Sequence, residues 1–172
     1  MAHSLFTVRD DGWFVPTELG RGPWSEHALH GGPVAALVAH AAEAVLADSA
    51  ADARVPVRLT LDLERPVPLA PLRVQAAVVR PGRKVQVAEV TVHDESGTRL
   101  ARGSVLAIRR TPVDLPDDLV TVDDPQPTPR DDAVEVVTWE PMGADVVAFH
   151  KDGTDHRFVV GGMLEPGPAI DW

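Results

Sequence analysis

Three residues that could take part in catalysis lie directly before a long apolar run that begins at Pro33. They are His30, Gly31 and Gly32. Proline is common at the first position of a helix, and the N–H groups of a first helical turn have no acceptor within the helix. These N–H groups and the helix dipole attract negative charge, so the segment can stabilise the oxyanion that forms on an attacked carbonyl. The alternative is structural, with glycines that allow a tight turn and a histidine that caps the loop.

Attack by water on a carbonyl also requires a group that orients or deprotonates the water. The nearest acid along the apolar run is Glu43, which makes it the local candidate for a general base. A single glutamate near the end of a helix also commonly reaches solvent or pairs with an arginine, and that alternative stays open.

Three cations, Arg80, Arg83 and Lys84, flank the dipeptide Pro81-Gly82. This dipeptide favours a turn between two strands, so the cations gather at a hairpin tip, where they can close on phosphate groups. An ordinary solvated turn is the alternative. The formal net charge of -10 argues against nucleic acid as a partner, because its binders usually carry a basic surplus. The hairpin therefore predicts a small polyphosphate ligand.

Trp24 lies in the Gly-rich segment before the apolar run and can line a tunnel for substrate or pack over the helix. His27 and His30 are three residues apart, but no further ligand follows at helical spacing, so no metal site is predicted. No cofactor is predicted either. The chain has no cysteine, which excludes disulfides and a cysteine nucleophile and favours a reducing compartment.

The elements that must position these residues follow from apolar patterning. Residues 5–19 predict two short strands around Asp11-Gly12, and the run from Gly32 to Ala47 predicts a helix buried almost all round. Residues 55–67 alternate strictly, as expected of a half-buried strand. Three further strands form an antiparallel meander, at 72–80, 84–94 and 98–110. A curved antiparallel sheet wrapped around one helix, an α+β fold, is the expected architecture.

The chain divides into a domain at 1–110, a Pro/Asp-rich linker at 111–132 and the start of a second domain at 133–172. The N-terminus has no signal-peptide pattern. The longest apolar stretch is interrupted by His40 and Glu43 and is too short to span a bilayer. A cytoplasmic protein with no membrane partner is predicted.

The strings HGGPVAALVAHAAE and VVRPGRKVQVAEVTVHDESGTRLARGS resemble the thioesterase superfamily with the hotdog fold. The linker and the later string FHKDGTDHRFVVGGMLEPGPAIDW resemble the double-hotdog acyl-CoA thioesterases of the TesB type. The resemblance implies one whole hotdog unit, an incomplete second unit, and hydrolysis of fatty acyl-CoA thioesters by activated water. It also implies that units pair into a homo-oligomer, a dimer or a dimer of dimers.

The resemblance further implies where catalytic groups lie. Single-hotdog relatives place the thioester carbonyl at the His-Gly-Gly turn and a carboxylate on the helix, at the position that is Ala39 here, and Glu43 lies one turn further on. Double-hotdog relatives carry the catalytic Asp, Thr or Ser, and Gln downstream of Trp172. Two functions stay open, a thioesterase and a non-catalytic acyl-CoA-binding or dimer-forming scaffold. A hotdog hydratase is not indicated, because no Asp and His pair precedes the helix.

Overall fold

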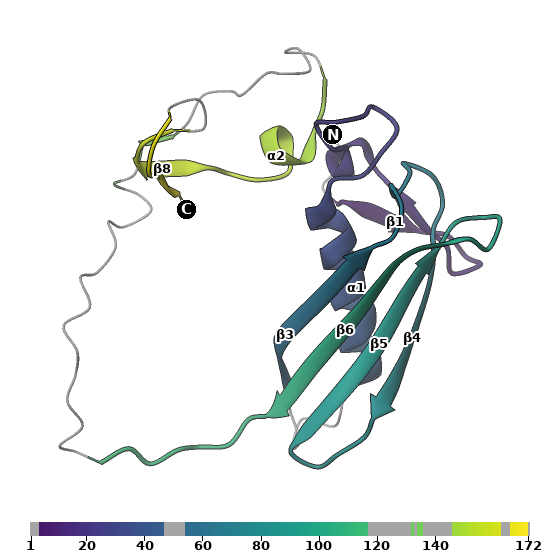
Figure 1. Ribbon diagram of the computed structural model, residues 1–172, viewed down its shortest axis with the longest axis vertical. Coiled ribbons are helices and arrows are strands. Elements are labelled where there is room, and N and C mark those ends of the chain that lie inside the picture. The colour runs from purple at the N-terminus through teal and green to yellow at the C-terminus, as the bar shows by residue number, and fades with distance from the viewer. Residues whose placement is uncertain are drawn as a thin grey trace. The chain divides into compact units, whose positions relative to one another are not determined.

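The computed structural model describes residues 4–46, 54–116, 132, 134–135, 146–162 and 166–171 (Figure 1). The chain forms two compact units, of which the first comprises Met1–Thr111 with Val147–Gly153 and the second Pro112–Val146 with Thr154–Trp172. Most of the predicted linker at 111–132 lies outside the described residues. The first unit carries every site residue named above.

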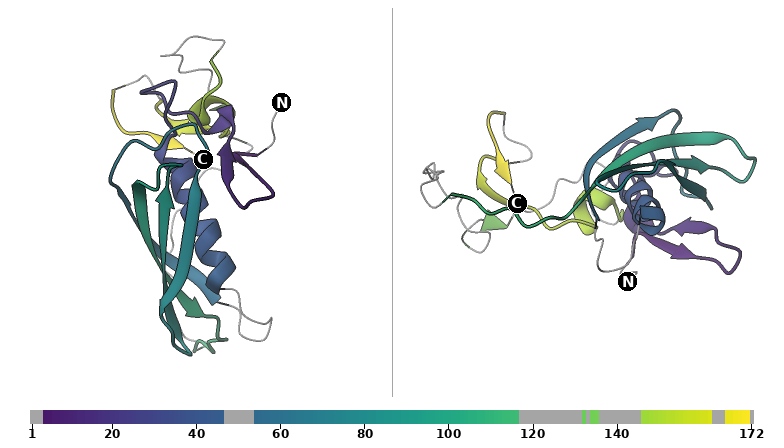
Figure 2. Two further views of the ribbon diagram at one scale, coloured as in Figure 1. Left: turned by 90° about the vertical axis from the view of Figure 1, so that its right-hand side faces the viewer. Right: turned by 90° about the horizontal axis from the view of Figure 1, so that it is seen from below.

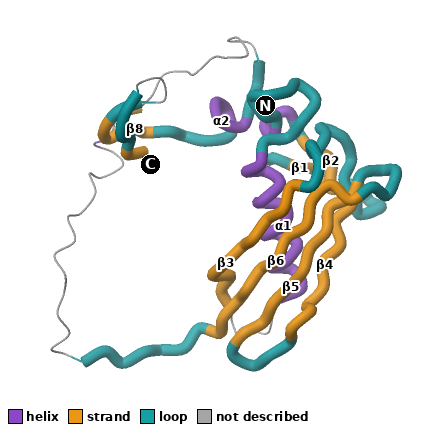
Figure 3. The backbone as a smooth tube through the Cα atoms, viewed as in Figure 1, coloured by secondary structure: helices purple, strands orange, loops and turns teal. Residues whose placement is uncertain are grey.

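The first unit is built on a four-stranded antiparallel sheet with the strand order β3-β6-β5-β4 (Figure 3). Its strands are β3 (Arg54–Leu63), β4 (Arg73–Arg80), β5 (Val85–His93) and β6 (Arg99–Arg109). Consecutive strands β4, β5 and β6 pair as neighbours, so the predicted meander is confirmed. With the helix α1 (Gly31–Leu46) packed on one face, this is the α+β sheet-and-helix architecture that the patterning predicted and the hotdog fold that the resemblance implied.

A short hairpin of β1 (Phe6–Val8) and β2 (Phe14–Pro16) precedes the helix, as predicted. Gly12 in its turn has φ +81°, a left-handed conformation that favours glycine. Phe14 and Leu72 exchange two backbone hydrogen bonds of 3.0 and 2.8 Å, which tie the hairpin to the start of β4. In Figure 2, α1 lies between the sheet and this hairpin.

The helix α1 buries one stripe, against the sheet and the hairpin, and exposes another. Val34, Leu37, Val38 and Ala42 are buried, whereas Ala36, His40, Glu43 and Ala44 are exposed. The expectation of a helix buried almost all round is therefore wrong for its outer side, because the hairpin covers only part of that side. The predicted helix end at Ala47 lies outside the described residues. No helix among the described residues is long and apolar enough to cross a membrane.

Strand β3 lies at one end of the sheet and is less buried than its alternating sequence predicted. Val57, Leu59 and Leu63 keep 51%, 36% and 53% of their surface exposed. The register shifts between Pro56 and Arg58, which leaves Val57 in a bulge, and α1 packs mainly on β4 and β5. The apolar face of β3 thus extends past the helix that was expected to cover it.

The second unit contains β7 (Val134–Glu135), β8 (Arg157–Val160) and β9 (Ile170–Asp171), paired antiparallel in the order β7-β8-β9. Asp155 and His156 precede β8 in a loop. His156 hydrogen-bonds Asp171 instead of its neighbour, with 2.6 Å between Nδ1 and Oδ2. The bond ties the loop before β8 to its neighbouring strand β9.

The helix α1 packs tightly on the sheet at Gly103 of β6, where a Cβ atom would collide with the side chain of Val38. Val38 is fully buried. We expect Gly103→Ala to lower the free energy of unfolding by about 1–3 kcal/mol, the usual cost of overpacking a core. Urea denaturation measures this change.

A matched control for this substitution is Gly31→Ala. A Cβ atom at Gly31 meets only Leu63 Cδ1, at 3.7 Å. Alanine also favours helix by about 1 kcal/mol over glycine, so this variant keeps or gains stability. Equal losses in the two variants would contradict the assignment of Gly103 as the close contact.

Candidate functional site

The chain reaches the start of α1 through a loop fixed by backbone hydrogen bonds. His30 N donates to Gly20 O at 2.9 Å, and Leu29 N donates to Val67 O at 2.8 Å. A Cβ atom at Gly22 would lie 3.2 Å from His30 N, so the loop folds back closely on itself. These contacts hold the His30 backbone directly before the first helical turn.

The His30 side chain turns back on the helix that it precedes. Gly32 N donates a hydrogen bond to His30 Nδ1, with 3.0 Å between the two nitrogens. A neutral imidazole has one donor and one acceptor, so the ring proton lies on Nε2. Burial lowers the pKa of His30 from its ordinary value, since it removes water that would stabilise the charged ring. His30 is therefore a neutral ring with an Nε2–H donor at pH 7.

Two aromatic rings enclose this imidazole. Trp24 stacks on His30 with 5.5 Å between ring centroids and 12° between planes, and Phe149 stacks at 5.0 Å and 29°. Trp24 is otherwise 79% exposed, so the predicted substrate-binding tryptophan presents most of its surface to solvent. Phe149 begins α2 (Phe149–Asp152) and is fixed by its N–H, which donates to Arg21 O at 3.0 Å.

Phe149 is a member of the site that sequence analysis missed. A Cβ atom at Gly32 would lie 2.7 Å from Phe149 Cε1, so the ring contacts the backbone where the glycine has no side chain. The residue lies far along the chain from His30, and no local pattern marks it. The glycine string was recognised, whereas the ring that requires glycine there was not.

The donors at the helix start differ from the predicted set. The Gly32 N–H is used by His30, while the Gly31 N–H has no acceptor among the described residues. His30 Nε2–H is the second available donor. With the positive end of the helix dipole, these groups can polarise a carbonyl oxygen and stabilise negative charge on it.

Glu43 is not brought together with this helix start within the chain. It lies eleven residues after Gly32 on the same helix, which corresponds to about 16 Å along the axis. Its side chain is exposed. No described carboxylate hydrogen-bonds or forms an ion pair with His30. A catalytic role for Glu43 stays a prediction.

The basic hairpin lies at the opposite end of the sheet. Arg80, Arg83 and Lys84 are exposed at the β4–β5 turn, and Arg54 Nη2 donates to Gly82 O at 3.2 Å. Arg54 begins β3, whereas Leu63 at its other end lies near Gly31. Nine steps of about 3.3 Å separate the two ends by about 30 Å, so one chain does not bring the cations to His30.

The two histidines considered for metal binding, His27 and His30, make different contacts. His27 Nε2 lies 3.3 Å from Glu26 Oε1 in an exposed pair, while His30 is enclosed by rings. Within the described part of the chain, no group of three or more His, Cys, Asp or Glu residues could hold a metal ion.

Residues 20–108, just over half of the chain, match the family model of the acyl-CoA thioesterase N-terminal domain. The chain belongs to this family. The matched residues include the helix-start loop, all of α1 and nearly all of the four-stranded sheet, so this member of the thioesterase superfamily carries His30, Gly31 and Gly32 within the family's own domain, whereas Phe149 lies outside it. No functionally curated protein matches the chain.

Two solved structures share the fold. The putative thioesterase II of Thermobifida fusca aligns with a TM-score of 0.60 over 89% of this chain and 51% of its own, at 17% identity. This thioesterase-superfamily chain thus spans about half the length of that protein. The BH2602 protein of Bacillus halodurans, solved with CoA, aligns with a TM-score of 0.52 over 63% of this chain and 74% of its own, at 23% identity.

The half-buried imidazole of His30 predicts a pH dependence. Because the pKa of His30 is lowered in the folded state, the unfolded chain takes up this proton first as the pH falls. The contribution of His30 to stability is full above its ordinary pKa of 6.5 and is lost as pH falls from 6.5 through the lowered value. We expect the His30 ring resonances to titrate below 6.5 in an NMR pH series.

His30→Asn is the matched variant, because its amide oxygen can accept the Gly32 N–H without titrating. We expect its unfolding free energy to fall less than that of the wild type between about pH 7 and pH 5. A wild-type ring that titrates at or above 6.5, or two identical stability profiles, would contradict the assignment.

Proposed function

We propose that this thioesterase-superfamily protein binds fatty acyl-CoA thioesters with the thioester carbonyl at the start of α1. The observation that carries the proposal is His30, a neutral ring that accepts the Gly32 N–H through Nδ1 and keeps Nε2–H as a donor, at a helix start where the Gly31 N–H has no acceptor among the described residues. Membership of the acyl-CoA thioesterase family and the CoA in the Bacillus halodurans structure support it. We also propose a cytoplasmic location, which suits a chain without cysteine.

These donors act on a carbonyl that gains charge during attack. The ground-state oxygen carries a partial charge, and the tetrahedral intermediate carries a full one, so the two donors bind the transition state more strongly. Trp24 and Phe149 stack on the ring and reduce its exposure to water, which strengthens a hydrogen bond from the ring to an oxyanion. The described residues are thus sufficient to bind and polarise a thioester carbonyl.

Water activation is the step that these residues support least. A positioned acid or base contributes about 10²–10⁴ in rate, and Glu43 lies far along the helix. We propose that the groups that activate water come from outside residues 1–110, as the resemblance to double-hotdog enzymes implies. The second candidate function, an acyl-CoA-binding scaffold, is favoured by the same observation.

The 172-residue chain alone is therefore expected to hydrolyse acyl-CoA poorly or not at all while still binding it. Steady-state assays over a series of acyl-CoA chain lengths measure turnover, and calorimetry measures binding. Turnover of about 1 s⁻¹ or more would overturn this expectation, since it lies in the ordinary enzyme range. Its loss in Glu43→Gln would then identify Glu43 as the base. Failure of acyl-CoA to bind at all would reject the proposed function.

We further propose that the protein self-associates through the free edge of β3. Among the described strands, β3 pairs only with β6, and its apolar side chains Leu59 and Leu63 are exposed beside α1. Pro56 lacks an N–H and Val57 lies in a bulge, so a ladder with a second copy is confined to Arg58–Leu63. A two-fold axis at the centre of this stretch makes the pair antiparallel.

This pairing brings the two separated halves of the site together. When Leu63 of one copy lies opposite Arg58 of the other, Arg54 of the second copy lies about 13 Å beyond the helix start of the first. Arg54 holds the hairpin that carries Arg83, through its hydrogen bonds to Gly82 O and Arg83 O. The cations of one copy can thus bind the CoA phosphates while the other copy binds the carbonyl.

Cross-linking tests this arrangement without background, because the chain has no cysteine. Chains with Arg83→Cys and chains with Leu63→Cys are mixed and treated with a flexible bis-maleimide. We expect cross-linked hybrid dimers. Arg83→Cys chains alone should not cross-link, because a two-fold axis keeps the two hairpins at opposite ends. A stable monomer in sedimentation at micromolar concentration would refute the pairing.

A further inference from the structure

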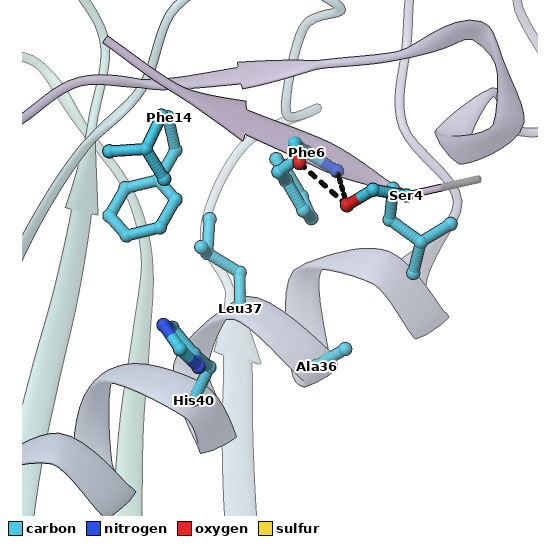
Figure 4. A pocket seen from close by; sticks show the side chains of 8 residues that line it. Ser4, Phe6, Phe14, Ala36, Leu37 and His40 are labelled. Carbon is cyan, nitrogen blue, oxygen red and sulfur yellow. Dashed lines mark hydrogen bonds between the residues drawn. The ribbon is translucent and has the colours of Figure 1, made fainter. Parts of the chain in front are cut away.

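A second feature of the first unit is a pocket between the β1–β2 hairpin and the exposed stripe of α1 (Figure 4). Its volume is about 490 Å³, within the usual range for small-molecule sites. Phe6 and Phe14 point from the hairpin toward the helix, and Leu37 and His40 point from the helix toward the hairpin. Ala36 lines it from the helix as well.

The lining is apolar except at Ser4 and His40. Ser4 stands at its edge, but its hydroxyl donates to Phe6 O at 2.7 Å and so offers no donor to a ligand. His40 is the remaining polar side chain, and its ring stands edge-to-face with Phe14 at 6.1 Å and 78°. A charged ligand would lose its hydration here with only one imidazole to replace it. The pocket therefore suits an apolar group.

The pocket continues the stripe of α1 that begins at the candidate site. Gly32, Ala36 and His40 are spaced by four residues, so they lie above one another on one face of the helix. Ala36 lies about 6 Å and His40 about 12 Å beyond Gly32 along the axis. A linear group that is attached to a carbonyl at the helix start and directed along this face leads to the pocket, past the ring of Phe149 that lies against Gly32.

We propose that this pocket holds the acyl chain of the thioester and that His40 sets its preferred length. This inference rests on the proposed function and extends it to a substrate class. An extended alkyl chain advances about 1.3 Å per carbon, so about nine or ten carbons span the distance from Gly32 to His40. The class is a medium-chain, saturated acyl group, with the imidazole of His40 at its far end.

Ala36 and His40 give two opposite tests, and neither side chain belongs to the buried core. Ala36→Phe fills the pocket near its middle, so we expect the affinity for decanoate to fall about tenfold or more. His40→Ala opens the far end, so the preferred carboxylate should lengthen by two or more carbons. Ala44→Phe is the matched control, because Ala44 is exposed on the same helix and does not line the pocket.

The probes are saturated carboxylates of six to sixteen carbons, titrated by calorimetry, together with the matching acyl-CoA thioesters. Equal effects of Ala36→Phe and Ala44→Phe on decanoate affinity would overturn the proposal, as would an unchanged chain-length preference in His40→Ala. Carboxylate binding that follows these variants without any acyl-CoA binding would retain the pocket and reject the proposed function. Acyl-CoA binding that is unchanged in these variants would retain the proposed function and reject the pocket as the acyl site.

Discussion

The contact between Val38 of α1 and Gly103 of β6 fixes the distance between helix and sheet, and the rest of the first unit depends on that distance. A strand residue with a side chain would move the helix outward, because interiors are packed without spare volume. With the helix held close, its inner stripe is fully buried and its outer stripe is left to the hairpin. The same placement puts Gly31 beside Leu63, at the end of β3.

The need of the first helical N–H groups for a hydrogen-bond acceptor explains why a histidine lies at the helix start. An N-terminal N–H left without an acceptor in an apolar setting costs free energy, and His30 Nδ1 supplies an acceptor for Gly32. This bond also fixes the tautomer, so one interaction caps the helix and presents an Nε2–H donor. The structural and the chemical interpretations of His30 are therefore compatible, because the same ring does both.

Local patterning predicted the elements well because each has a period that its burial requires. The alternation of β5 and β6 and the apolar run of α1 are examples, and the Pro81-Gly82 turn lies where the sequence put it. Contacts between residues far apart in the sequence were not predicted. The stacking of Phe149 on His30 depends on a segment far along the chain, and the exposure of Leu63 depends on how far the helix extends over an end strand. Neither feature produces a periodic pattern in the sequence.

The three parts of the proposed ligand differ in the free energy that their removal from water costs, and the candidate binding surfaces differ in the same way. Phosphates and the cations that bind them lose hydration when buried, and exposed groups such as Arg83 avoid most of that cost. A thioester carbonyl carries little charge until it is attacked, so it can lie among the rings of Trp24 and Phe149, where each hydrogen bond is stronger than in water. An alkyl chain gains free energy from any apolar enclosure. Three surfaces of different polarity, at separate places on the fold, therefore suit one ligand that is charged at one end and apolar at the other.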